Sequence, residues 1–213
     1  MARSFLGELL PLQDRKLVLA SESPRRIDML RQMGLHFEIY PAKIQEVPPS
    51  YTDAVDFVRH NARNKAVWVG ERVSADLIIA ADTVVVEGGD IFEKPGNREE
   101  ALAMLQRLSG KTHEVITGLC LKVDDREVVD HEVTRVTFYP MSEKEIEAYL
   151  DSGEPFDKAG AYGIQGLAGL FVQKVEGCYF NVVGFPLGRF YQLLKRVAKE
   201  SGWGDAGAEF PGG

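Results

Sequence analysis

Apolar residues along this chain follow two periods, and together they predict alternating strands and helices. Short continuous or alternating apolar runs predict strands at residues 16–20, 36–40, 77–86, 113–123 and 127–139. Apolar residues spaced three or four apart predict helices at residues 24–33, 52–69, 97–108, 142–150 and 188–199. This mixed order, with no repeat or linker dividing it, predicts an α/β or α+β fold built on one twisted mixed sheet flanked by helices.

Local signals place several helix ends. Ser23 is expected to cap the first of these helices, with a proline following at the position where its missing N–H costs nothing, and Gly34 is expected to end it. Thr52 is expected to cap the second helix. Ser142 and Glu145 have the spacing of a capping box.

The two ends of the chain look different from its middle. Residues 1–14 predict a flexible leader, and residues 201–213, rich in glycine and alanine, predict a flexible tail. Residues 15–200 are expected to form the folded domain. No run of about 18 apolar residues occurs, so no membrane partner is expected.

Charge and cysteine content limit the function classes. The formal net charge is −7, which argues against stable nucleic-acid binding, although a few local cations can still hold a small phosphorylated ligand. The two cysteines, Cys120 and Cys178, lie far apart and outside any metal-ligand spacing. Both are interpreted as packing residues in a reducing compartment, which predicts a cytoplasmic protein.

The turn from Ser21 to Arg26 is the first candidate site. A helix N-terminus presents unpaired N–H groups and a partial positive charge, which favour a phosphate. Arg25 and Arg26 add donors suited to bidentate phosphate contacts. The alternative is an ordinary helix cap followed by two solvated arginines.

Asp82 is the second candidate, because it interrupts an otherwise apolar predicted strand. A buried aspartate is costly unless it is paired, hydrogen-bonded or bound to a metal, and such residues are often catalytic. The alternative is a strand end at which Asp82 only accepts backbone hydrogen bonds.

Other candidates are weak when taken alone. Lys94 before a helix, Lys65 within one and Glu46 in a proline-containing loop would each ordinarily be solvated. The segment 154–166 is unusual for its glycines, which suit a backbone that faces a ligand. Gln165 within it carries an amide that can read a base edge, although a tight bend at a sheet edge explains the glycines equally well.

In combination these segments resemble the Maf family over about residues 16–195. The matching motifs occur in the family's order: LASESPRR at 19–26, ADTVV at 81–85, EKP at 93–95, LSGKTH at 108–113, DKAGAYGIQG at 157–166 and NVVGFPL at 181–187. The resemblance implies a two-lobed fold with a central cleft, similar in architecture to the inosine triphosphate pyrophosphatases. It also implies hydrolysis of a nucleoside triphosphate between its α- and β-phosphates, giving the monophosphate and pyrophosphate.

The resemblance also implies roles for individual residues. Asp82 matches the family's general base and Glu46 an acidic residue near the attacking water, and the two are expected to hold a divalent cation, Mg²⁺ or Mn²⁺. The phosphate-site residues are matched by Ser21, Arg25, Arg26, Lys65 and Lys94. The AGAYGIQG form is similar to the branch that acts on dTTP and UTP, in which Arg25, Thr83 and Gln165 match the positions tied to base selectivity.

The chain departs from the family pattern at several positions, and the resemblance leaves alternative functions open. Glu22 and Ala168 stand where the family carries smaller residues, Ala81 replaces a common glycine, and an aspartate often found before Glu46 is missing. Family members are also linked to inhibition of septum formation, so a nucleotide-binding regulator of cell division with little turnover is the alternative. Modified pyrimidine nucleotides are alternative substrates, and the resemblance implies a homodimer.

Overall fold

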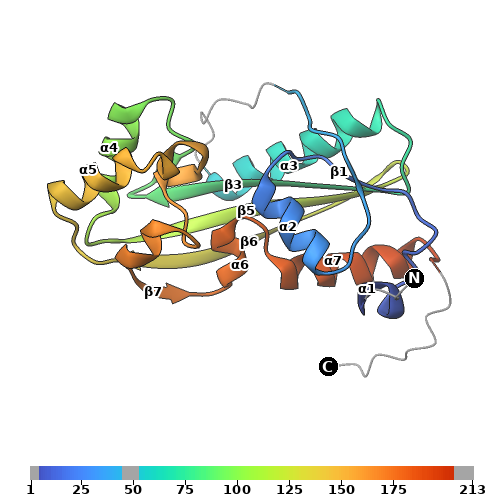
Figure 1. Cartoon of the computed structure of the whole chain (residues 1–213). Coiled ribbons are helices and arrows are strands. Elements are labelled where there is room, and N and C mark those ends of the chain that lie inside the picture. The colour runs from blue at the N-terminus through green and yellow to red at the C-terminus, as the bar shows by residue number, and fades with distance from the viewer. Residues whose placement is uncertain (1–4, 45–52, 204–213) are drawn as a thin grey trace.

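The computed structural model describes residues 5–44 and 53–203. Its centre is one seven-stranded mixed sheet in the order β2-β1-β3-β5-β6-β7, with β4 beside β3 (Figure 1). Strand β1 pairs in parallel with β2 and β3, and the other neighbours are antiparallel. The strands are β1 Leu17–Leu19, β2 Glu38–Ile39, β3 Leu77–Glu87, β4 Asp90–Phe92, β5 Thr112–Val123, β6 Arg126–Phe138 and β7 Val172–Glu176.

Helices cover both faces of this sheet (Figure 1). The α-helices are α1 Phe5–Leu9, α2 Pro24–Gln32, α3 Ala54–Gly70, α4 Arg98–Leu108, α5 Glu143–Asp151, α6 Tyr179–Val183 and α7 Leu187–Glu200. Three 3₁₀-helices, η1 Glu154–Asp157, η2 Ala159–Ala161 and η3 Leu167–Phe171, follow α5. The predicted mixed fold is therefore confirmed.

Side-chain alternation along β3 assigns each helix to a face. Ile78 and Ala80 pack into a cluster with α3, whereas Ile79 and Ala81 pack into a larger cluster with α2 and α7. Successive strand residues point to opposite faces, so one strand contributes to both layers. Because β3 is covered on both faces, its apolar run is nearly continuous.

A glycine lets α3 approach the sheet closely. Gly118 on β5 lies directly opposite Asp82 on β3. A Cβ at Gly118 would overlap the backbone carbonyl of Val58 on α3. The missing side chain therefore brings α3 against the sheet beside Asp82.

The clusters with α2, α3 and α7 form one lobe of the protein. A second lobe is built at the other end of the long strands β3, β5 and β6. Val85, Val115 and Phe138 from β3, β5 and β6 form a separate buried cluster with α4, α5 and η2. The predicted capping box of Ser142 and Glu145 is present at the start of α5 and is confirmed. The two lobes thus share β3, β5 and β6.

Among the described residues, no strand pairs with one edge of β3 between the lobes, and this part is called the uncovered edge here. Strand β1 pairs with residues 77–79 of β3, and β4 pairs with residues 85–87. The intervening residues pair with β5 on their other side. This gap contains Asp82 and Thr83, so the sheet topology places both of them at the junction of the lobes.

The N-terminal leader is the clearest difference from the sequence expectation. Residues 5–9 form α1, and Leu6, Leu10 and Leu12 are buried in the cluster with α2 and α7. Burial of these apolar side chains favours a packed segment over a flexible one. Of the expected tail, Trp203 is buried in the same cluster, and the Arg15 guanidinium lies 4.3 Å from the centre of its ring.

Smaller differences concern caps and the glycine-rich segment. Ser23 occupies the N-cap of α2, but its side chain makes no capping hydrogen bond. Asp53 caps α3 by accepting from the backbone N–H of Val55, and the expected cap, Thr52, lies outside the described residues. Strand β7 and helix α6 were not predicted from the sequence.

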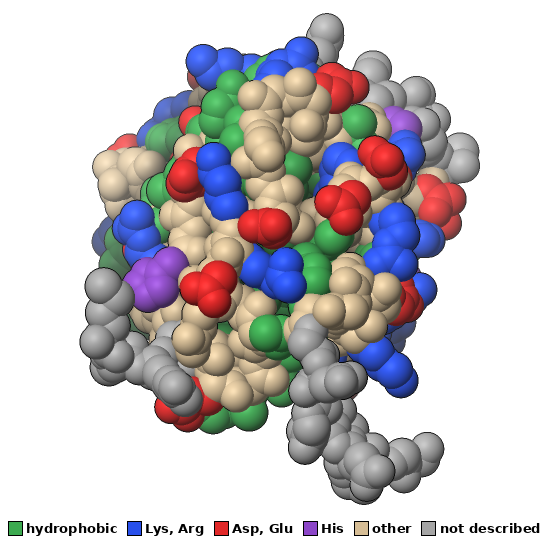
Figure 2. Space-filling view, turned by 90° about the vertical axis from the view of Figure 1, so that its right-hand side faces the viewer, with side chains coloured by type: hydrophobic (Ala, Val, Ile, Leu, Met, Phe, Trp, Pro, Cys, Tyr) green, Lys and Arg blue, Asp and Glu red, His purple; other side chains and the backbone are tan. Residues whose placement is uncertain are grey.

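Two surface properties bear on possible partners. Within the described ranges, every helix is too short or too polar to cross a membrane. Figure 2 shows the end of the molecule at the right of Figure 1, where basic and acidic side chains are interspersed.

Candidate active site

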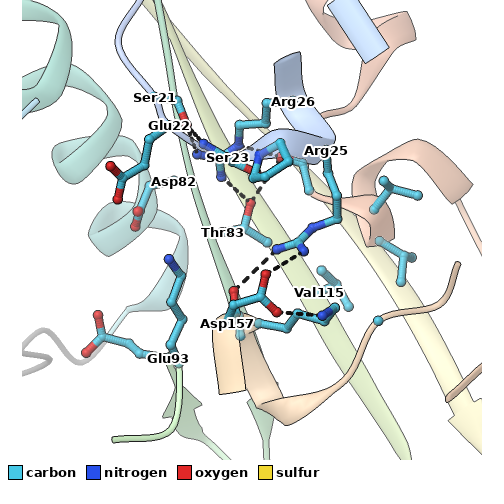
Figure 3. Close-up of a pocket in the computed structure, with 18 of the residues that line it drawn as sticks. Ser21, Glu22, Ser23, Arg25, Arg26, Asp82, Thr83, Glu93, Val115 and Asp157 are labelled. Carbon is cyan, nitrogen blue, oxygen red and sulfur yellow. Dashed lines mark hydrogen bonds and ion pairs between the residues drawn. The ribbon is translucent and has the colours of Figure 1, made fainter. Parts of the chain in front are cut away.

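A cleft of about 1030 Å³ opens at the uncovered edge of β3, between the lobes (Figure 3). All the site residues predicted from the sequence that belong to the described ranges line it, namely Ser21, Arg25, Arg26, Lys65, Asp82, Thr83, Lys94 and Gln165. Glu46 lies outside the described residues. The fold therefore gathers residues from five separate stretches of the sequence around one cavity.

Asp82 is held by two side chains of α3. The Lys65 Nζ lies 2.6 Å from Asp82 Oδ1, and Asn61 Nδ2 donates to Asp82 Oδ2 at 3.1 Å. Asn61 and Lys65 are one helical turn apart, so they occupy the same face of α3. Asp82 is only 6% exposed, and the burial of a carboxylate is costly unless such partners hydrogen-bond to it.

Arg26 is held on the opposite face of the sheet. Its guanidinium donates four hydrogen bonds to neutral oxygens, at 2.9 to 3.3 Å: the backbone carbonyls of Ala81 and Gly184 and the hydroxyls of Ser21 and Thr83. The Ala81 carbonyl belongs to the uncovered edge of β3. Arg26 therefore ties α2 and the segment after α6 to that edge.

Arg25, the neighbour of Arg26, crosses the cleft instead. Its Nη1 lies 3.0 Å from Asp157 Oδ2, and its Nη2 donates to the Asp157 backbone carbonyl at 3.3 Å. In Figure 3 the two side chains point toward one another, whereas Arg26 points toward Thr83. Consecutive arginines of one helical turn thus serve different walls of the cleft.

Glu154 organises the glycine-rich wall that carries Gln165. Its carboxylate accepts from the Tyr149 hydroxyl and from the Leu167 backbone N–H, both at 2.9 Å. A Cβ at Gly166 would overlap this carboxylate, so the glycine allows the segment to fold around Glu154. The exposed Gln165 side chain is consequently presented at the cleft.

A buried histidine supports the same wall. His113 Nε2 lies 2.9 Å from the Tyr162 hydroxyl, and Phe138 packs edge-on against both rings. Burial lowers the pKa of His113 to about 4, so the ring is neutral near pH 7. Tyr162 lines the cleft, which makes His113 part of the scaffold behind it.

The charge of the cleft differs from that of the whole chain. Among the described residues it is lined by six basic side chains (Arg25, Arg26, Lys43, Lys65, Lys94 and Lys158) and five acidic ones (Glu22, Asp82, Glu93, Glu154 and Asp157). The formal charge of the chain is −7. An anion therefore meets a more favourable environment in the cleft than over the rest of the surface.

Comparison with known proteins identifies the family. The sequence model described as Maf-like protein matches residues 16–197. The chain belongs to the Maf family. Among its relatives, the "dTTP/UTP pyrophosphatase" of Clostridium perfringens strain SM101 is 45% identical over 84% of this chain and 96% of that protein. The "dTTP/UTP pyrophosphatase" of Carboxydothermus hydrogenoformans is 48% identical over 84% and 97%. The solved Staphylococcus aureus Ham1 protein is 13% identical over 87% of this chain and 99% of that chain, with a TM-score of 0.44.

The structure places the departures of this Maf-family chain from the family pattern. Glu22 is exposed and lines the cleft on the same side of β3 as Asp82 (Figure 3). Ala81 is buried, and the position contributes its carbonyl to Arg26. Ala168 is fully buried in the cluster behind the glycine-rich wall.

Several residues of this Maf site were not singled out from the sequence. Asn61 shares the Asp82 carboxylate with Lys65, and its place one turn before Lys65 was a signal that could have identified it. Asp157 and Glu154 lie in the glycine-containing segment 154–166, but the sequence pattern assigns neither a role of its own. Their partners, Arg25 and Leu167, become apparent only when the chain is folded.

Proposed function

We propose that this protein hydrolyses dTTP and UTP to the nucleoside monophosphate and pyrophosphate. The names of its relatives support the reaction class and the substrates. The observation that carries the proposal is the position of Asp82. This buried carboxylate lies at the uncovered edge of β3, in a cleft that it shares with Arg25, Lys65 and Lys94.

The local chemistry suits hydrolysis of a phosphoanhydride. Water is a poor nucleophile toward an anionic phosphate, so a carboxylate that orients it and accepts its proton lowers the barrier. The Lys65 ammonium, 2.6 Å from Asp82 Oδ1, holds this carboxylate in place at the cleft. Water then adds across the α–β phosphoanhydride, and cations such as Lys94 offset the charge on the departing pyrophosphate. A direct phosphate contact of Arg26 remains a prediction.

A divalent cation fits the donor chemistry of this cleft. Among the residues described, no group of three His, Cys, Asp or Glu side chains is arranged to bind a metal. Mg²⁺, however, commonly uses one or two carboxylates, with substrate phosphates and waters completing its shell. Asp82 and, in our proposal, Glu46 would hold Mg²⁺ or Mn²⁺. Bound there, the ion would supply charge neutralisation at the phosphates.

Part of the lining of the cleft suits a nucleobase. Val115, Tyr162 and Ile164 line the cleft together with the exposed amide of Gln165. Apolar side chains with a few polar groups are typical of sites for aromatic ligands. Gln165 and Arg25 are therefore proposed to read the pyrimidine. The Thr83 hydroxyl already bonds Arg26 and Thr117, so its proposed part in selectivity acts through this network.

The experiment is pyrophosphate release from dTTP, UTP, CTP, GTP and ATP, each with Mg²⁺, Mn²⁺ or a chelator. We expect release from dTTP and UTP with metal and little release from the others. Equal rates on all five nucleotides would contradict the substrate class. Tight binding without turnover would instead indicate the division regulator, which the relatives' names do not favour. A cytoplasmic location remains a proposal from the cysteine content, and a homodimer and modified pyrimidine substrates remain proposals from the family resemblance.

A further inference from the structure

The link between Arg25 and Asp157 joins the two lobes across the cleft. Arg25 comes from the first turn of α2, and Asp157 ends η1, 132 residues later in the sequence. One guanidinium contacts both the carboxylate and the backbone carbonyl of the same residue, at 3.0 and 3.3 Å. Two contacts to one partner fix the rotation of a planar guanidinium as well as its position.

Asp157 is itself held from the other side. Lys158 Nζ lies 2.5 Å from Asp157 Oδ1 and donates to the Glu154 carbonyl at 2.6 Å. Burial alone would raise the pKa of Asp157, but the hydrogen bonds from Lys158 and Arg25 outweigh it and hold that pKa below its usual value. The carboxylate that anchors Arg25 is therefore charged at neutral pH.

The link between Arg25 and Asp157 lies away from Asp82 in the cleft. Figure 3 shows Arg25 and Asp157 below Thr83 and near Val115, while the Asp82 side chain projects on the other side of β3. Asp82 pairs instead with Lys65 on α3. A change at Asp157 should therefore alter the preference between nucleotides more than the rate of proton transfer to Asp82.

We propose that Asp157 is a positioning residue that fixes Arg25 in the orientation that selects the nucleobase. The inference rests on the proposed nucleotide site. An arginine side chain has many rotamers, and selective hydrogen bonding to a base edge requires one of them to be held before binding. Without the carboxylate, Arg25 can reorient to suit several bases, so discrimination falls.

The test compares Asp157→Asn with two other variants. Asp157→Glu keeps the negative charge and should retain part of the wild-type preference for UTP over CTP. Asp151→Asn is the matched control, because Asp151 forms an exposed ion pair with Arg98 in the same lobe, at 2.8 Å, and is not among the residues that line the cleft. Calorimetry gives the Kd of the non-hydrolysable α,β-methylene analogues of UTP and CTP, and pyrophosphate release gives kcat and KM.

We expect Asp157→Asn to reduce the preference for UTP over CTP by about tenfold, in Kd and in KM, since directly coupled side chains interact on this scale. The kcat for UTP should change by less than about threefold, because Asp82 keeps its partners. The control should keep the wild-type preference. An equal change in Kd for both analogues would overturn the proposal, because loss of a negative charge alone strengthens the binding of all nucleotides alike.

A double-mutant cycle separates this role from a general structural one. In an Arg25→Ala background, Asp157→Asn should leave the UTP to CTP preference unchanged, and additive effects would refute action through Arg25. Failure of the proposed reaction is distinguishable. A wild-type protein that bound the analogues selectively without releasing pyrophosphate would refute the reaction, while the Kd ratios would still decide the role of Asp157.

Discussion

Asp82 and Thr83 are neighbours on β3, but their side chains belong to polar clusters on opposite faces of the sheet. On the α3 face a carboxylate meets an ammonium group and an amide. On the α2 face the Arg26 guanidinium meets hydroxyl and carbonyl oxygens. The first arrangement joins a carboxylate to an ammonium group, and the second joins a guanidinium to hydroxyl and carbonyl oxygens that tie α2 to the sheet. Two adjacent residues can therefore divide chemistry and architecture between them, and variants should separate the two clusters.

Asp82→Asn should produce the largest separation. The amide keeps the shape and can still contact Asn61 and Lys65, but it cannot accept a proton. We expect kcat for UTP to fall by at least about 100-fold, the usual contribution of a general base. The Kd of the α,β-methylene analogue should change far less. Thr83→Val, on the other face, should lower kcat much less, and equal losses in the two variants would contradict the division.

Arg26→Ala should affect stability first. It removes the Arg26 donor from the carbonyls of Ala81 and Gly184, although Gly184 keeps the Thr83 hydroxyl at 3.4 Å, and we expect a loss of about 3 kcal/mol in the free energy of unfolding. Urea unfolding measures this. Arg31→Ala, an exposed arginine of the same helix, is the control and should change stability little. A stable Arg26→Ala protein would show that the α2 cluster is not architectural.

The pH dependence of stability can be tested at His113, which belongs to neither of the two polar clusters. Its pKa is about 4 in the folded protein against an ordinary value of 6.5, so the unfolded chain binds the proton more readily. The contribution of the neutral His113 ring to the free energy of unfolding is therefore fully present above pH 6.5. It decreases as the pH drops toward 4, by about 3 kcal/mol in all. Urea unfolding of His113→Gln should show a smaller loss over this range than the wild type. Identical pH dependence in the two proteins would refute the assignment.

Gly118→Ala should give the smallest effect and a selective one. The added methyl group would push α3 away from the sheet beside Asp82, and overpacking of this kind costs about 2 kcal/mol. Because α3 carries Asn61 and Lys65, kcat should also fall. Gly188→Ala is the matched control, since a Cβ there meets nothing within 4 Å. Loss of activity in both variants would mean that the effect is not specific to α3.

Much of the fold was predictable because its elements are long and periodic. The apolar run of β3 and the amphipathic pattern of α4 locate these elements from local sequence alone, and the capping signal before α5 adds a boundary. Helix α1 was missed because five residues with one buried leucine carry too little periodicity. Its stability comes from tertiary packing.

The site was predictable in its members but not in its pairings. Asp82 was identified because a carboxylate in an apolar strand needs a partner, and the partner proved to be Lys65, which had been assigned to phosphate. The two arginines looked equivalent in the sequence. Only the folded chain, which brings Asp157 to one and Gly184 to the other, distinguishes them.

The three long strands common to both lobes limit how the protein can adapt to a substrate. A rotation of one lobe away from the other would bend continuous ladders of hydrogen bonds, because β3 and β5 are paired from residue 78 to residue 86 of β3. Such ladders resist bending far more than a flexible linker does. We therefore expect the cleft to keep its width and different nucleotides to be accommodated by rotations of individual side chains that line it.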